Sequence, residues 1–384
     1  MSLLSRNPSA KSNNYLLQAR LSGHLGAIAC LGVTEDGKLL ASGGSDGTKI
    51  WDLDTMKPIR SPSSAGVRGA STALTWIQRE DEPGEAFFFG TQNGFLVCWR
   101  QGRYTGGSQE FEEIYCQQLT RPAEITGVAF DSASNRLAVC HRNSIVQSYS
   151  LDVQMVPHPI FSITVNNFVP KAIAFGAING NERDILTFGL YNGHIHTLRG
   201  SVGDIVESWN VGGYIGDAVV DSRKGVVCID DPACGVGLYR LDDHHRVKTF
   251  DIPVTKQKRP RKVCFADESR VIVCGSDHGI VYVFDRRSGD TLDELRIDAS
   301  DWVQTIATTD CNGVSTILAA KSREIGGPNE IFVWRKRSEK RRFTAGLSWS
   351  MMTIVQVAMV IATLAFVYQN MTLGKLVVGQ IGRF

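Results

Sequence analysis

The chain has 384 residues, 43% of them hydrophobic, and a formal net charge of +2 at pH 7. This length suits two average domains or one large repeat domain, with enough apolar material for a core. The basic excess lies in residues 335–343, which carry six Lys or Arg against one Glu. The body of the chain therefore lacks the positive charge that is typical of nucleic-acid binding.

The N-terminus shows no targeting signal. Residues 1–14 are polar, without the apolar stretch of a secretory signal, and we interpret them as a disordered leader. The nine cysteines form no C-x-x-C pair, and several fall inside apolar runs, as Cys98 does in "FLVCW". This usage favours free, buried thiols in a reducing compartment over a disulfide framework.

A repeat is explicit in residues 23–52, GHLGAIACLGVTEDGKLLASGGSDGTKIWD. Three strands are separated by EDGK and SDGT turns, and the third closes on Trp51. Six weaker copies follow at intervals of 41–50 residues, each with its third strand ending on a large apolar side chain. These closing residues are Trp99, Tyr149, Leu198, Tyr239, Phe284 and Trp334. Such a period indicates units that bury their apolar faces by stacking on their neighbours.

The unit from Gly23 to Asp52 resembles the WD-repeat β-propeller family, in which each repeat supplies one four-stranded blade. The resemblance is specific in the first repeat and holds as a pattern in the other six, over about residues 15–335. It implies an all-β, seven-bladed propeller. It also implies a structural hydrogen-bonded tetrad of His24, Ser42, Asp46 and Trp51. The sixth repeat departs from it, with Cys274 in place of the serine and Phe284 in place of the tryptophan.

Seven units counted by their third strands leave the last blade one strand short. The segment YLLQARL, residues 15–21, precedes the first Gly-His pair and has the composition of a strand. We expect it to complete the last blade and so to close the ring beside Trp334.

The C-terminal region predicts a membrane anchor. Residues 347–368 carry no charge, and 22 residues at a 1.5 Å rise would cross a hydrocarbon core of about 30 Å. Trp349 and Tyr368 stand near its ends, where interfacial aromatic residues belong. We expect a juxtamembrane linker over 336–346 and a short lumenal tail over 369–384. The basic residues before the span are Arg335, Lys336, Arg337, Lys340, Arg341 and Arg342.

This distribution of charge predicts a cytosolic propeller on a single-pass, tail-anchored membrane protein. The endoplasmic reticulum is the favoured membrane and the mitochondrial outer membrane the alternative. The expected partners are cytosolic proteins that bind the propeller surface and the lipid bilayer, with anionic headgroups possible near the basic cluster. No nucleic acid and no small-molecule substrate is expected.

Motifs of enzymes are not found in the sequence: there is no G-x-S-x-G elbow, P-loop or dinucleotide fingerprint. We expect no catalytic activity, cofactor or metal. His194 and His196 could share one strand face, but no third ligand is visible nearby. The basic run KQKRPRK, residues 256–262, is interpreted as a solvated loop, with contact to acidic partners or lipids as the alternative.

Two functions remain open from the sequence. The first is a membrane-tethered interaction scaffold that presents the propeller to cytosolic proteins. The second is an endoplasmic-reticulum exchange factor or regulator of a small GTPase. The WD-repeat family includes such a factor with the same layout of a propeller and one span, but no motif in this chain points to it.

Overall fold

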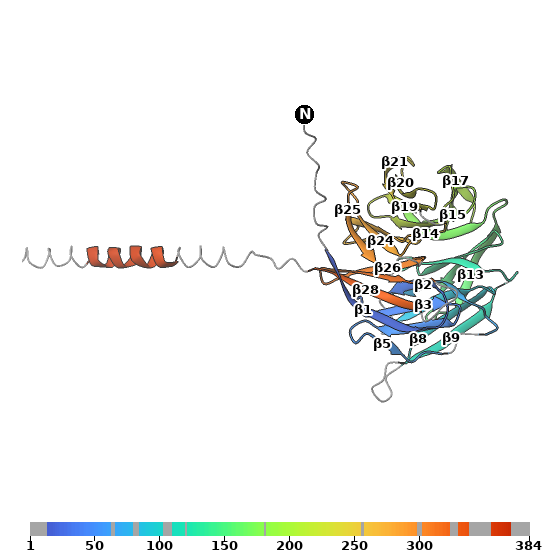
Figure 1. Ribbon diagram of the computed structural model, residues 1–384, viewed down its shortest axis with the longest axis horizontal. Coiled ribbons are helices and arrows are strands. Elements are labelled where there is room, and N and C mark those ends of the chain that lie inside the picture. Colours follow the sequence, from blue (N-terminus) through green and yellow to red (C-terminus); the bar gives the residue numbers. More distant parts are fainter. Residues whose placement is uncertain are drawn as a thin grey trace, which may run out of the picture. The chain divides into compact units, whose positions relative to one another are not determined.

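The computed structural model describes residues 14–62, 66–79, 84–102, 110–119, 121–179, 182–254, 257–297, 302–322, 329–337 and 355–369. Within these ranges, 28 strands form seven four-stranded antiparallel sheets, which confirms the expected all-β propeller of seven blades (Figure 1). A second unit, residues 338–384, separates from the propeller unit and is described by itself.

The first four blades follow the chain in order, each running from its innermost to its outermost strand. Blade 1 contains β2 (Ile28–Val33), β3 (Leu39–Gly44), β4 (Gly47–Asp52) and β5 (Lys57–Ile59). Blade 2 contains β6 (Ser71–Ile77), β7 (Ala86–Thr91), β8 (Phe95–Gln101) and β9 (Phe111–Gln118). Blade 3 contains β10 (Ile125–Asp131), β11 (Arg136–His141), β12 (Ile145–Leu151) and β13 (Pro157–Thr164). Blade 4 contains β14 (Pro170–Asn179), β15 (Glu182–Gly189), β16 (His194–Leu198) and β17 (Ile205–Asn210).

The last three blades follow the same scheme, except that the seventh takes its outermost strand from the start of the chain. Blade 5 contains β18 (Asp217–Asp221), β19 (Val226–Asp231), β20 (Gly235–Arg240) and β21 (Arg246–Asp251). Blade 6 contains β22 (Val263–Ala266), β23 (Val271–Cys274), β24 (Ile280–Asp285) and β25 (Thr291–Arg296). Blade 7 contains β26 (Thr305–Cys311), β27 (Val314–Ala320), β28 (Asn329–Lys336) and β1 (Tyr15–His24).

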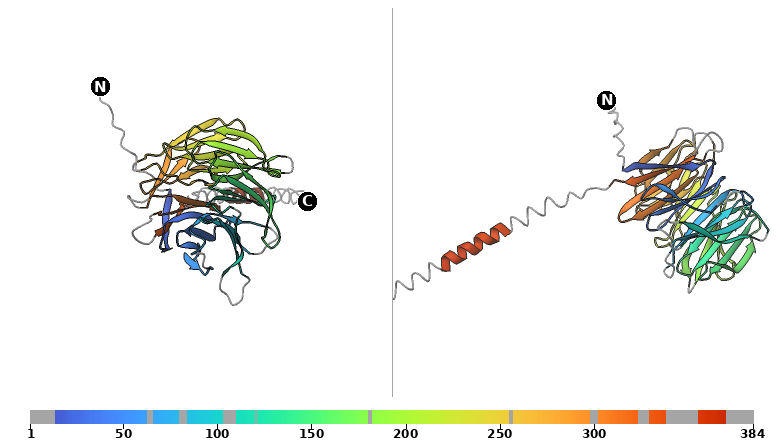
Figure 2. Two further views of the ribbon diagram at one scale, coloured as in Figure 1. Left: turned by 90° about the vertical axis from the view of Figure 1, so that its right-hand side faces the viewer. Right: turned by 90° about the horizontal axis from the view of Figure 1, so that it is seen from below.

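The blades form a closed ring. The innermost strands contact one another in the cyclic order β2, β6, β10, β14, β18, β22 and β26, and β26 contacts β2 again. Figure 2 shows the same succession from two further sides, in the order of the colours. The seven innermost strands therefore surround a central channel, and their ends lie at its two openings.

The ring closes through the expected segment. Strand β1 pairs antiparallel with β28, and Leu21 lies opposite Ile331 in the register. In Figure 1 the blue β1 therefore lies beside the orange β28, although they are about 300 residues apart in the chain. The expectation that residues 15–21 complete the last blade is confirmed. Strand β28 runs to Lys336, one residue beyond the expected end of the propeller.

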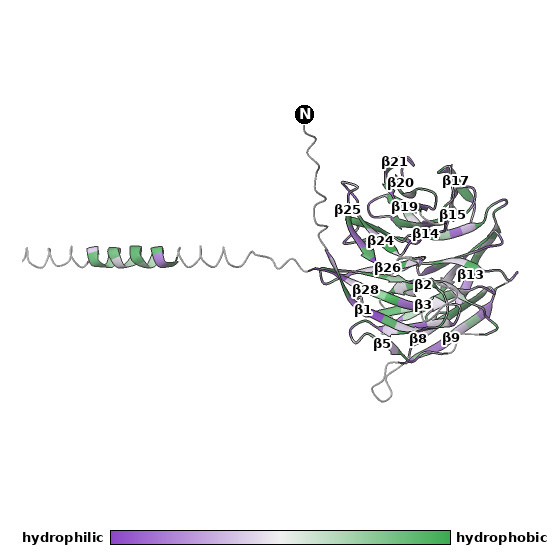
Figure 3. Ribbon diagram, in the orientation of Figure 1, coloured by the Kyte–Doolittle hydropathy of each residue, from purple (hydrophilic) through white to green (hydrophobic). Residues whose placement is uncertain are grey.

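The core consists of seven apolar clusters, one at each contact between neighbouring blades. Strand β7 shows the cause. Successive side chains of a strand point to opposite faces, so Phe87 and Phe89 pack with blade 1 while Phe88 packs with blade 3. A strand between two blades must be apolar on both faces, which explains the continuous apolar runs visible in green in Figure 3.

The expected membrane span is not formed by the described residues. A single helix runs over residues 355–369, and residues 347–354, with Trp349, lie outside the described part. Fifteen residues rise only about 22 Å, and Gln356 and Thr363 interrupt the apolar sequence. No helix in the described ranges is long and apolar enough to cross a membrane. The prediction of a single-pass protein of the endoplasmic reticulum or mitochondrial outer membrane is therefore wrong.

The residues that were expected to flank the membrane span fall into two groups. Lys340, Arg341 and Arg342 lie outside the described residues, as do 1–13 and 370–384, whereas Tyr368 lies in the helix. The other three basic residues belong to the propeller. Arg335 donates to the carbonyl of Leu53 at 3.2 Å, Lys336 pairs with Asp267 at 2.7 Å, and the backbone N–H of Arg337 donates to the carbonyl of Asn14 at 2.7 Å. These contacts fasten the end of β28 to its neighbours in the propeller.

Candidate binding site at the mouth of the central channel

The four tetrad residues come together where β1 of blade 7 leads into blade 1. His24 Nδ1 lies 2.6 Å from Asp46 Oδ1, and its Nε2 lies 2.8 Å from Ser42 Oγ. Trp51 Nε1 donates to the same Ser42 oxygen at 2.8 Å. Asp46 also accepts the backbone N–H of Leu25 at 2.9 Å. These contacts link β1, the strand that closes the ring, to β3 and β4.

Burial governs the protonation of the hydrogen-bonded tetrad. Burial lowers the pKa of His24, and the contact with Asp46 only partly opposes that shift. Burial acts to raise the pKa of Asp46, but its hydrogen bonds to His24 and to the Leu25 N–H outweigh burial and hold the pKa below its ordinary value. The imidazole is therefore neutral near pH 7, and it connects a carboxylate to a hydroxyl.

The closing residues occupy equivalent places in all seven blades. Each lies on the third strand opposite a buried apolar residue of the second strand, as Trp51 lies opposite Leu40 and Trp99 opposite Phe87. All are buried: Trp99, Tyr149, Leu198, Tyr239, Phe284 and Trp334. Trp99 shows how a blade without the tetrad serine is satisfied, because its Nε1 donates to Glu113 Oε2 at 3.2 Å.

The two faces of the ring are formed by different turns and connections. Four antiparallel strands place the connections between blades, and the turns between second and third strands, on one face, which we call the connection face. It includes Leu25, Val67, and segments 190–193 and 211–216. The turns between first and second strands, and between third and fourth strands, lie on the opposite face. The central channel opens on the connection face where the innermost strands begin.

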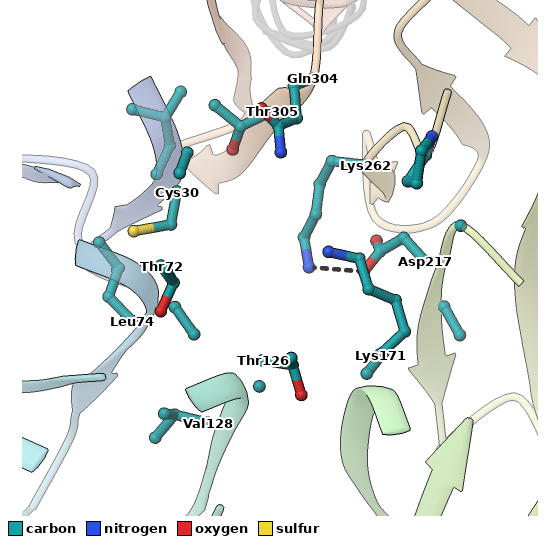
Figure 4. Close-up of a pocket in the computed structure, with 18 of the residues that line it drawn as sticks. Cys30, Thr72, Leu74, Thr126, Val128, Lys171, Asp217, Lys262, Gln304 and Thr305 are labelled. Atoms are coloured by element: carbon teal, nitrogen blue, oxygen red, sulfur yellow. Dashed lines mark hydrogen bonds and ion pairs between the residues drawn. The ribbon is translucent and has the colours of Figure 1, made fainter. Parts of the chain in front are cut away.

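One residue at the start of each innermost strand faces the channel. In blades 1 to 4 this residue is the extra one of a β-bulge, as Thr72 is between Ser71 and Ala73. We define the channel mouth by the residues at this place, which are Ala29, Thr72, Thr126, Lys171, Gly216, Lys262 and Gln304. They line a cavity of about 110 Å³ together with Asp217 and their strand neighbours (Figure 4).

The wall supplied by blades 1 to 3 is uncharged. The Thr72 hydroxyl donates to the carbonyl of Ile125 and the Thr126 hydroxyl to that of Pro170, both at 2.7 Å. Each hydroxyl thus joins its blade to the next. Burial raises the pKa of Cys30 to about 12, so its thiol stays neutral and adds no negative charge to the channel.

The wall supplied by blades 4 to 6 is cationic. Figure 4 shows Lys171 and Lys262 extending into the cavity, with a single ion pair drawn from Lys262 to Asp217. Lys262 Nζ lies 3.1 Å from Asp217 Oδ1, and Asp217 Oδ2 accepts the backbone N–H of Val263 at 3.1 Å. Each oxygen of this carboxylate therefore has one partner. Among the described residues Lys171 makes no ion pair and no side-chain hydrogen bond.

The two ammonium groups have opposite pKa shifts. Burial lowers the pKa of Lys171, the attraction of Asp217 opposes this shift only in part, and the nearby charge of Lys262 adds to it. Enclosure also acts to lower the pKa of Lys262, but the attraction of Asp217 outweighs it and the net shift is upward. Of the two lysines at the channel mouth, Lys171 is the one without an ion-pair partner among the described residues.

A buried ion pair lies beside this wall. Arg261 is 3% exposed and Asp230 is fully buried, with Arg261 Nη2 2.7 Å from Asp230 Oδ1. Arg261 also donates to the carbonyl of Asp231 at 2.7 Å, and its backbone N–H donates to Asp230 Oδ2 at 2.9 Å. Gly216 is required next to it, because a Cβ there would lie 2.1 Å from Asp230 Oδ2.

The basic run over 256–262 is therefore only partly a solvated loop. Lys256 lies outside the described residues, and Arg261 and Lys262 turn inward to Asp230 and Asp217. Arg259 lies over the Trp302 ring, 4.8 Å from its centroid. Sequence reasoning missed the channel wall, because both acidic partners come from another blade and no local pattern connects them to the run.

The two histidines of the HxH segment lie together without forming a metal site. The rings of His194 and His196 stack at 6.0 Å between centroids, and His196 Nδ1 lies 2.7 Å from the Ser208 hydroxyl. Within the part of the chain that the structure describes, no group of three or more His, Cys, Asp or Glu side chains could hold a metal ion.

Comparison with known proteins identifies the first repeat. Residues 16–52 match the family model described as WD domain, G-beta repeat. The match covers most of β1 and extends to the end of β4, so it contains the whole tetrad. No curated protein matches the chain. The matched repeat and the seven-bladed ring both agree with the resemblance to WD-repeat propellers that the sequence indicates.

Proposed function

We propose that the propeller is a protein-interaction scaffold that binds partner proteins on its connection face. The observation that carries the proposal is a pair of exposed tyrosines on that face. Tyr191, in the turn between β15 and β16, and Tyr214, between β17 and β18, are 59% and 55% exposed. Their rings meet edge to face with centroids 6.2 Å apart. Tyr, Trp and Arg dominate the binding energy of protein interfaces, because they offer large contact areas with polar ends.

Other exposed apolar residues support the same face. Leu25 and Val67 lie on connections between blades and are 83% and 84% exposed. Arg259 and Trp302 add a cation–π pair on the connection segments around blade 6. Large exposed apolar residues, rimmed by charged groups, are typical of surfaces that a partner covers. No observation among the described residues favours the alternative of a GTPase exchange factor.

The test compares the two faces of one blade. Full-length protein and two double variants are used for affinity capture with quantitative mass spectrometry, and each captured protein is then purified and titrated. Tyr191→Ala/Tyr214→Ala removes the pair on the connection face. Ile178→Ala/Val202→Ala removes two apolar residues of blade 4 that are 63% and 50% exposed on the opposite face, and serves as the matched control.

We expect the tyrosine variant to lose at least tenfold in affinity for a specific partner, equivalent to about 1.4 kcal/mol. The control should bind that partner as the wild type does. Equal binding by both variants would move the interface away from the tyrosine pair. If no captured protein binds the wild type saturably and with a fixed stoichiometry, the scaffold function is refuted.

A further inference from the structure

We propose that the channel mouth is a binding site for a single phosphate-class oxyanion, held between Lys171 and Lys262. This inference goes beyond the proposed scaffold role and does not depend on it, because the site lies inside the channel rather than on the exposed loops. It rests on the charge, the hydrogen-bond donors and the size of one cavity.

The lysine-bearing wall of the cavity has a net positive charge. Lys171 and Lys262 face one cavity, and Asp217 is the single carboxylate in its lining and pairs with Lys262. Arg261 and Asp230 pair with each other and cancel. Glu124 and Arg142, which also act on Lys171, form their own ion pair at 2.5 Å. One positive charge is therefore left over at this half-buried wall, and an anion would neutralise it.

The same wall has hydrogen-bond donors available for a ligand. One contact of Lys262 Nζ goes to Asp217, so further N–H groups of this ammonium remain for a ligand. Lys171 adds an ammonium that makes no hydrogen bond to any described residue, and the side chain of Gln304 faces the same space in Figure 4. Lysine is a usual phosphate binder, acting as a point charge with several donors. Three donor groups on one side of a cavity suit a group with several acceptor oxygens.

The remaining wall sets the size and excludes competing charge. The cavity of about 110 Å³ is large enough for several waters or one phosphate group. The Thr72 and Thr126 protons are already committed to neighbouring carbonyls, and Cys30 is neutral. No carboxylate other than Asp217 stands among the lining residues. The wall opposite the lysines therefore does not repel an anion.

Two sources can supply this group, a free phosphate or a phosphorylated side chain of a partner. The experiment uses full-length protein, isothermal titration calorimetry, and two probes, inorganic phosphate and a capped phosphoserine, with capped serine as the blank. Lys171→Met removes the uncompensated charge at similar length. Lys57→Met, an exposed lysine on β5, is the matched control.

We expect both probes to bind the wild type and the Lys57→Met protein equally, and Lys171→Met to weaken binding at least tenfold. Tighter binding of phosphoserine than of phosphate would assign the site to a phosphorylated partner, and the reverse would assign it to free phosphate. Lys171→Arg should retain most of the affinity. A wild type that binds neither probe, or a Lys171→Met protein that binds both unchanged, would overturn the proposal.

Thermal unfolding keeps the result interpretable. Lys171 is half-buried and makes no ion pair with a described residue, so its replacement should leave the melting temperature of the free protein unchanged or raised, and Lys171→Met is expected to be folded. Phosphate should raise the melting temperature of the wild type and not that of Lys171→Met. A phosphate-dependent rise of equal size in both proteins would also overturn the proposal, because it would place the anion elsewhere.

Discussion

Leu17 of the first strand is paired with Trp334 of the last, so the two ends of the propeller sequence share one blade. Tyr15 strengthens this junction. It is 4% exposed, packs in the cluster between blades 6 and 7, and its hydroxyl lies 3.3 Å from that of Ser315. Leu21 is buried in the cluster on the other face of the same blade, between blades 7 and 1. Strand β1 thus contributes to two of the seven core clusters.

Removing residues 1–21 should therefore destabilise the propeller by about 3–6 kcal/mol, at 1.5–3 kcal/mol for each of two fully buried side chains. The unpaired edge of β28 should also promote aggregation. Urea denaturation of the truncated chain, followed by tryptophan fluorescence, measures the loss. Removal of residues 1–13 alone leaves β1 whole and is the control, which should unfold at the wild-type midpoint. Equal midpoints for both truncations would show that β1 does not hold the ring closed.

The tetrad predicts a characteristic pattern of coupling. Trp51→Ala should cost about 3–5 kcal/mol, as expected when a buried aromatic side chain is removed. His24→Ala should cost less, and the double variant should lose less than the sum, because both side chains act through Ser42 Oγ. His24→Ala combined with Phe250→Leu in blade 5 is the control and should be additive. Additive losses for His24 and Trp51 would exclude a shared network.

Stability should also fall on the acid side of neutrality. Burial lowers the pKa of His24, and His141 and His196 are shifted in the same direction for the same cause. As the pH falls below about 6.5, the unfolded chain binds protons that the folded protein does not, so unfolding becomes easier until the lowered folded pKa is reached. Each such proton contributes at most about 1.4 kcal/mol per pH unit.

The measurement is denaturant unfolding at pH 7.5, 6.5 and 5.5. His24→Gln should be less stable than the wild type at pH 7.5 and should show a shallower fall toward pH 5.5, since one linked proton is removed. A slope equal to that of the wild type would mean that His24 is not protonated on unfolding in this range.

The repeat could be predicted from the sequence because its causes are local. Turn residues fix the hairpins, and the apolar side chain that ends each third strand recurs at one place in the register, from Trp51 to Trp334. Ring closure followed from counting strands, since a blade with an unpaired edge would be incomplete.

The channel mouth and the C-terminal region could not be predicted in this way. Arg261 meets Asp230 across 31 residues of sequence, and burial of this pair depends on two neighbouring blades. A basic run is usually solvated, so its sequence alone indicates the wrong environment. In the C-terminal region the uncharged stretch predicted a span of 22 residues, but the described helix covers residues 355–369 and is not long and apolar enough to cross a membrane.

The Arg261–Asp230 pair gives the last prediction, because removing one partner leaves a buried charge. Arg261→Met should destabilise the propeller by about 3–5 kcal/mol at pH 8. Burial already raises the pKa of Asp230 to about 7 against the pull of Arg261, so the loss of Arg261 should raise it further. An acid whose folded pKa is raised stabilises the fold below its unfolded pKa near 4, and this contribution is lost as the pH rises through the folded value.

Arg261→Met should therefore be closer to the wild type at pH 5, where Asp230 holds its proton, than at pH 8. Arg261→Met/Asp230→Leu removes both charges and should recover much of the loss at pH 8 without any dependence on this carboxyl. Arg270→Met, which breaks an exposed pair with Glu268, is the control and should change the unfolding free energy by less than about 1 kcal/mol. Equal destabilisation of Arg261→Met at both pH values would show that the buried carboxyl does not take up a proton when its partner is removed. The pair would then stabilise the channel wall through packing and hydrogen bonds rather than through charge.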